Sequence, residues 1–221
     1  MREDLEQQEQ LAALKAFWAS NRKWITSILI ILVLISVSTT GWKYYTESRQ
    51  LQASKLLSSM QEAVEEQKID DAILITNELS KNYSSYPQRS LAGLILAKAL
   101  VFDDRKEEAE KQLRNLLNID SDISWVARVR LAGLLLDMNK PVEALSILPE
   151  KIPSIWIGIV SDRRGDVLMA LGKKVEARSA WVRALEVYGV DRAEGVARNM
   201  IKMKLATIDS LQVVDKKSGA K

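Results

Sequence analysis

The sequence predicts an all-α protein in which an N-terminal transmembrane helix is followed by a helical-repeat domain, an α-solenoid. Three observations carry this prediction. Of the 221 residues, 47% are hydrophobic and only four are proline, and the abundant straight-chain side chains lose little rotamer freedom in helices. One uncharged run is long enough to span a membrane. Small residues recur at a spacing that is typical of helical repeats.

Residues 24–42, WITSILIILVLISVSTTGW, contain no charged side chain and carry tryptophan at both ends. At about 1.5 Å per residue such a helix is about 28 Å long, close to the roughly 30 Å hydrocarbon layer. Tryptophan at both ends is typical of the aromatic belts at membrane interfaces. We therefore interpret residues 24–42 as a signal-anchor helix in contact with membrane lipid, and residues 1–23 as a short cytoplasmic segment.

Two other interpretations of this run are a buried core helix and a cleaved signal peptide with a small-residue cleavage site at residues 36–38. Signal peptides begin short and basic, whereas the preceding segment is long and contains Glu3, Asp4, Glu6 and Glu9. Lysine and arginine are balanced on the two sides of the run, so charge alone does not fix the orientation. A short tail before a large domain favours a C-terminal domain outside the cytoplasm.

Four alanines mark a repeat in the following residues. Ala109, Ala144 and Ala177 are separated by 35 and 33 positions, and Ala72 lies 37 positions before Ala109. A period of about 34 residues is typical of the tetratricopeptide repeat. We therefore expect a tetratricopeptide-like domain over residues 43–210 and a flexible tail over residues 211–221.

Other columns keep a fixed spacing from these alanines. Small residues, expected where paired helices cross closely, lie twelve positions earlier: Ala97, Ala132 and Gly165. Leucines lie nine positions earlier: Leu100, Leu135 and Leu168. Residues that tolerate a left-handed backbone at a helix end lie five positions earlier: Asp104, Asn139 and Gly172. Large apolar residues lie four positions later: Leu113, Leu148 and Trp181.

The same pattern predicts the helix boundaries beyond the anchor. Proline is tolerated in the first turn of a helix, so Pro87 and Pro141 mark helix starts. The expected helices are 44–66, 69–82, 88–102, 105–117, 123–137, 141–148, 154–171, 174–187 and 192–210.

The segment 156–166, WIGIVSDRRGD, is followed by Gly172 and by ARSAW at 177–181. With the anchor and the repeats, it resembles the YfgM-like ancillary subunits of the SecYEG translocon, over nearly the whole chain. The resemblance implies a single-pass type II protein of the bacterial inner membrane, with its repeat domain in the periplasm. It also implies association with SecYEG, with a membrane-anchored periplasmic chaperone of the prolyl-isomerase type, and with exported client proteins. The N-terminal tail departs most from the family.

A partner-binding groove is expected on one face of the first helix of each repeat. With each repeat alanine numbered 20, positions 2, 5, 9 and 12 of such folds face the concave side. These positions hold Leu91, Leu94, Lys98 and Val101, then Val126, Val129, Gly133 and Leu136, then Ile159, Asp162, Asp166 and Met169. The face is mostly apolar, as binding surfaces often are. Alternatively, the groove is filled by the last helix or by the helix after the anchor.

Two charged features lie in the last repeat. Asp162 and Asp166 stand one helical turn apart, and could be an acid/base pair, a metal site or a polar groove lining. Arg164 occupies a position that is usually apolar. We hypothesise that its stem packs between helices while its guanidinium bonds nearby carboxylates or helix-end carbonyls. Three tryptophans could stack on a ligand, but we interpret them as packing residues: Trp125, Trp156 and Trp181.

Composition limits the chemistry. The chain has no cysteine and no histidine, which excludes thiol nucleophiles, serine–histidine–aspartate triads and the usual zinc ligands. We therefore expect no enzymatic activity and no metal or cofactor. Acidic and basic residues are interspersed, which predicts no nucleic-acid partner.

The sequence and the resemblance together predict an ancillary translocon subunit whose repeats bind chaperones or emerging clients. A membrane-anchored scaffold for another envelope assembly is the alternative, and a membrane-bound hydrolase that uses the aspartate pair is a third hypothesis.

Overall fold

The computed structural model describes residues 2–119, 121–188 and 192–218. In these ranges the regular structure is entirely helical, which confirms the predicted all-α class. The elements are α1 (Arg2–Glu65), α2 (Ile69–Asn82), α3 (Pro87–Phe102), α4 (Lys106–Asn115), α5 (Asp122–Asp137), α6 (Pro141–Ser146), the 3₁₀ turn η1 (Ser154–Trp156), α7 (Ile157–Ala170), α8 (Lys174–Val187) and α9 (Arg192–Ser218).

The expected boundaries need four corrections. The anchor and the helix after it form one continuous helix, α1, because the chain contains no proline before Pro87. Helix α6 ends before the expected residue 148, since the residue before a proline disfavours helix and Pro149 follows. The expected helix 154–171 is divided into η1 and α7. Helix α9 continues past residue 210 to Ser218, and the flexibility of residues 211–221 stays a prediction.

The chain divides between Gln52 and Ala53 into two units. In the first unit α1 stands alone, and within the described residues it is the one helix long and apolar enough to cross a membrane. Its apolar side chains over residues 28–37 are exposed, Leu34 to 60%. A helical stretch that exposes this much apolar surface suits a hydrocarbon environment.

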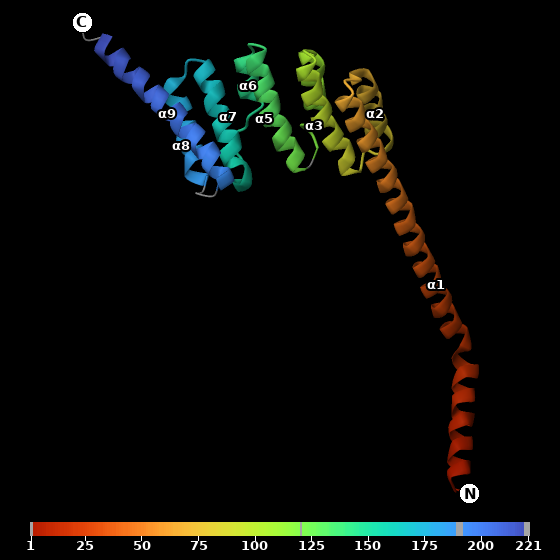
Figure 1. Cartoon of the computed structure of the whole chain (residues 1–221). Helices are drawn as coiled ribbons and strands as arrows, with labels where there is room; N and C mark the ends of the chain where they lie inside the picture. The colour runs from red at the N-terminus through yellow and green to blue at the C-terminus, as the bar shows by residue number, and fades with distance from the viewer. Residues whose placement is uncertain (1, 120, 189–191, 219–221) are drawn as a thin grey trace. The chain divides into compact units, whose positions relative to one another are not determined.

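The second unit consists of successive helical hairpins. The end of α1 pairs with α2, and α3 with α4, α5 with α6 and α7 with α8, while α9 packs on α8. Figure 1 shows α3, α5 and α7 following one another in chain order within this unit. Each hairpin packs on its neighbours, as expected of repeat proteins, in which stability is a sum of hairpin and nearest-neighbour terms.

A left-handed residue follows the first helix of every hairpin in the described residues. Gln67, Asp104, Asn139 and Gly172 have φ values of 60°, 58°, 57° and 73°. The N–H of the next residue in each case donates to a carbonyl five positions earlier: Lys68 to Ala63, Arg105 to Leu100, Lys140 to Leu135 and Lys173 to Leu168. This pattern is the Schellman motif. It occurs where the spacing predicts it, and Gln67 supplies the fourth copy.

The alanine column fixes how closely the two helices of a hairpin approach. All four alanines are fully buried: Ala72, Ala109, Ala144 and Ala177.

The core divides into two clusters, of which the larger runs from Ala53 to Val167 and contains most of the repeat alanines and leucines. The second cluster joins Trp181 of α8 to Ile201 and Ile208 of α9. Helix α9 therefore caps the last hairpin.

Asn139 offers a test of the left-handed column. A left-handed backbone costs about 1–2 kcal/mol for residues with a Cβ, and more for β-branched ones. We expect Asn139→Val to lower the free energy of unfolding by about 1–2 kcal/mol, whereas Asn139→Gly leaves it unchanged or raises it. Denaturant unfolding followed by circular dichroism measures both. Asn115→Val, at the exposed last residue of α4, is the control, and an equal loss there would contradict the explanation.

Candidate functional site

The predicted groove face is partly accessible in the structure. Four of its residues are exposed: Leu91, Lys98, Val101 and Ile159. Six are half-buried: Val126, Gly133, Leu136, Asp162, Asp166 and Met169. The remaining two, Leu94 and Val129, are only 6% exposed and belong to the larger core cluster. These two pack inside the unit and offer little surface to a partner, and the binding role of this face stays a prediction.

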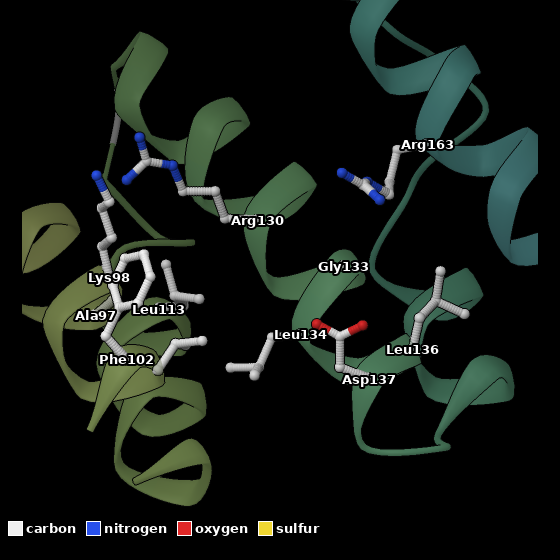
Figure 2. A pocket seen from close by; sticks show the side chains of 11 residues that line it. Ala97, Lys98, Phe102, Leu113, Arg130, Gly133, Leu134, Leu136, Asp137 and Arg163 are labelled. Atoms are coloured by element: carbon white, nitrogen blue, oxygen red, sulfur yellow. The ribbon is translucent and has the colours of Figure 1, made fainter. Parts of the chain in front are cut away.

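A pocket of about 530 Å³ lies on the open part of this face. Its lining comes mainly from α3 and α5, with one side chain from α4 and one from α7: Ala97, Lys98, Val101, Phe102, Leu113, Arg130, Gly133, Leu134, Leu136, Asp137 and Arg163. Figure 2 shows Lys98 and Phe102 on one side and Arg163 on the other, with Gly133 between them on α5. We call this the open groove.

The guanidinium of Arg163 lies against Gly133 in the open groove. A Cβ at Gly133 would lie 3.4 Å from Cζ of Arg163, in ordinary van der Waals contact. Arg163 also pairs with Asp166 on its own helix, with Nη1 and Oδ2 3.4 Å apart. Arg163 was not among the residues expected in the groove. The signal for it was Gly133 at groove position 9, where the other repeats have Lys98 and Asp166.

The acidic end of the groove is covered from within the chain. Nζ of Lys204, on α9, lies 2.7 Å from Oδ1 of Asp162 and 2.6 Å from Oδ1 of Asp166. The indole of Trp181 adds hydrogen bonds, because its Nε1 donates to the Asp162 carbonyl at 3.2 Å and to Asp166 Oδ1 at 3.3 Å. The last helix therefore fills this part of the groove, while the open groove stays uncovered by it.

Burial raises the pKa of the Asp162 carboxyl above its usual range, and the hydrogen bond from Lys204 opposes that shift. The ammonium of Lys204 also stands between the two carboxylates, where a shared metal ion would have to bind. Among the described residues, no group of three acidic, histidine or cysteine side chains is placed to hold a metal. The arrangement thus has the chemistry of a structural ion pair between α7 and α9.

The other charge in this segment, Arg164, connects α7 to the loop after α6. Its Nη1 donates to the Leu148 carbonyl at 2.7 Å, and its Nη2 lies 3.3 Å from Oε1 of Glu150. These are the two kinds of partner that the sequence hypothesis names. Gly165, beside it, allows α7 to approach α8, since a Cβ there would lie 2.4 Å from the Trp181 ring.

The other two tryptophans make contacts inside the repeat unit. Trp156 donates from Nε1 to Oδ1 of Asp122 at 3.1 Å, which joins η1 to the start of α5. The guanidinium of Arg128 lies 5.7 Å from the Trp125 ring centroid. Both rings are half-buried, and neither lines the open groove.

Comparison with known proteins places the chain in a family. The model of the tetratricopeptide repeat-like domain matches residues 15–211. The ancillary SecYEG translocon subunit of Neisseria gonorrhoeae is 30% identical over 209 residues, which cover 92% of this chain and 98% of that protein. The chain belongs to the family of ancillary SecYEG translocon subunits.

Other ancillary SecYEG translocon subunits match over most of their length. The protein of Escherichia coli K12 is 31% identical over 180 residues, which cover 78% of this chain and 84% of that protein. The protein of Buchnera aphidicola from Acyrthosiphon pisum is 23% identical over 189 residues, with 84% and 94% covered. The resemblance found in the sequence is thereby confirmed.

The contact of Lys204 with the aspartate pair can be tested by removing the ammonium alone. Lys204→Met leaves Asp162 without its cation and Asp166 with only the 3.4 Å ion pair to Arg163, and we expect it to lower the free energy of unfolding at pH 7 by about 1–3 kcal/mol. Without Lys204 the pKa of Asp162 rises further in the folded state. The folded state then binds protons more readily than the unfolded state, so the deficit should shrink as the pH falls toward about 4.

Urea titrations of both proteins at several pH values measure this deficit. Lys202→Met, an exposed lysine on the same helix, is the matched control and should change little. A deficit in Lys204→Met that stays constant with pH would show that the carboxylates are not its cause.

Proposed function

We propose that the chain is an ancillary subunit of the SecYEG translocon that is anchored in the bacterial inner membrane by α1. Its repeat domain lies in the periplasm and binds a membrane-anchored chaperone of the prolyl-isomerase type, or exported proteins as they emerge. It acts by binding and not as an enzyme.

One observation carries this proposal. The similarity to the ancillary subunit of Neisseria gonorrhoeae extends over 92% of this chain and 98% of that protein, so it includes both the apolar part of α1 and the helical hairpins. A scaffold that shared the repeats alone would match only in the repeats. A match over nearly the full length of both proteins favours the same role near the same membrane complex.

The open groove is the surface that suits binding best. It offers accessible apolar and charged side chains on the face that repeat proteins use for partners. The acidic pair supports a non-enzymatic role, because the ammonium of Lys204 contacts Oδ1 of both carboxylates and stands between them. The hydrolase hypothesis needs that position for a substrate or a water molecule.

Site-specific photo-crosslinking in intact cells tests the partners. A photoreactive residue at Leu34, exposed on the apolar part of α1, should capture translocon subunits. The same residue at Val101, 36% exposed in the open groove, should capture a periplasmic chaperone or exported proteins. Glu107, exposed on α4 outside the groove, serves as the control site. Capture of neither translocon subunits nor chaperones would contradict the proposal.

Cysteine labelling tests the orientation. The chain has no native cysteine, so only the introduced cysteine reacts. In spheroplasts, a membrane-impermeant maleimide should label Lys81→Cys, exposed on α2, without lysis. Gln7→Cys, exposed near the start of α1, should be labelled only after lysis because that segment lies in the cytoplasm. The reverse pattern would place the repeat domain in the cytoplasm.

A further inference from the structure

The open groove and the acidic end of the groove carry opposite charge. At the acidic end the lining consists of Asp162 and Asp166, and the chain itself supplies the matching cation, Lys204. In the open groove the lining has three cations, Lys98, Arg130 and Arg163, and one acid, Asp137. These cations would repel a lysine such as Lys204, with which α9 covers the acidic end. A segment that binds the open groove would therefore differ from α9 in charge.

Two of these cations have no anionic partner within the described residues. Lys98 is exposed, and its Nζ rests 5.6 Å from the Phe102 ring centroid. Arg130 donates from Nη1 to the Leu94 carbonyl at 3.2 Å, which leaves other N–H groups of its guanidinium available. Both therefore offer donors to an incoming carboxylate, and charge-assisted hydrogen bonds of this kind are stronger than neutral ones.

The third cation, Arg163, is held at the opposite wall. Its pairing with Asp166 is long, at 3.4 Å, and its Nε is buried without a hydrogen-bond partner in the described part of the chain. Figure 2 shows its guanidinium separated from Lys98 and Arg130 by the pocket. Positive charge thus stands on both sides of the open groove, and a ligand with more than one carboxylate would neutralise both.

Apolar surface lies between these charges. Phe102 is 82% exposed, and with Val101 and Leu136 it gives the pocket an apolar wall. Fully covering a side chain of this size contributes about 1.5–3 kcal/mol. A ligand made only of charge would leave this surface in water, so the groove suits a ligand that alternates apolar and acidic groups.

We propose that the open groove binds an extended or helical polypeptide segment of the partner in which carboxylates flank apolar side chains. Asp137 accepts N–H groups of such a segment, which the phosphate of an anionic lipid does not offer. This inference rests on the proposed function, since it names the chemistry of the segment that the repeat domain takes.

Binding of a short fluorescent peptide of alternating leucine and glutamate tests the proposal. The full-length chain is held in nanodiscs of neutral phosphatidylcholine, and fluorescence anisotropy measures the dissociation constant. Lys98→Glu should weaken binding about tenfold or more, the effect of losing one charge-assisted contact. Phe102→Ala should weaken it independently, and binding should weaken with added salt.

Matched controls separate charge from folding. Lys111→Glu makes the same charge change at an exposed site on α4 outside the pocket, and it should leave binding unchanged. Thermal unfolding should be alike for all three variants, because each alters an exposed side chain. A peptide with glutamine in place of glutamate should bind at least tenfold more weakly than the acidic peptide.

Several outcomes would overturn the inference. If the glutamine peptide binds as tightly as the acidic one, the groove recognises apolar segments alone, and the proposed function survives. If only short-chain phosphatidylglycerol binds, and does so through Lys98, the occupant is lipid. If the acidic peptide fails to bind and Lys98→Glu dissociates a dimer in analytical ultracentrifugation, the occupant is a second copy. Translocon crosslinks from Leu34 do not depend on any of these results.

Discussion

The left-handed residue at the end of each first helix is the constraint on which the repeat domain depends. At Gln67, Asp104, Asn139 and Gly172 the backbone turns with positive φ, and the following N–H closes the helix on a carbonyl five residues earlier. This turn directs the second helix of a hairpin back along the first. The repeat alanine of the second helix then faces the small residue of the first helix. In the last hairpin the small residue of the first helix is Gly165, and the absence of a Cβ there makes room for the Trp181 ring. The groove face then follows, because the first helices stand side by side.

The resulting groove has two ends, of which α9 covers one and leaves the other accessible. One end is completed by α9, whose Lys204 joins two carboxylates and whose Ile201 and Ile208 build the second core cluster. The other end keeps its cations and Phe102 accessible. A repeat array must close its final hairpin to remain soluble, and α9 does this at the acidic end. The cap therefore also determines which part of the groove remains for a partner.

The sequence predicts the repeat and its turns well because both depend on local spacing. Alanine, leucine and left-handed residues recur at fixed intervals, and the helix between them requires no distant contact. Contacts between distant residues were harder to foresee. Nothing near Lys204 in the sequence shows that it reaches Asp162, 42 positions away, although filling by the last helix was one of the alternatives. Arg163 lies against a glycine of another repeat, and Leu94 and Val129 are buried by neighbours that no single-helix periodicity describes.

The hairpins contact one another in chain order, and this has a consequence for how the protein is made. Within the described residues, the contacting helices are neighbours or next neighbours along the chain. Interactions so close in sequence favour rapid folding. As the chain emerges N-terminus first, each new hairpin finds the preceding one already available as a packing surface. Only the last hairpin must wait for α9, so the second core cluster is the final part of the molecule to form.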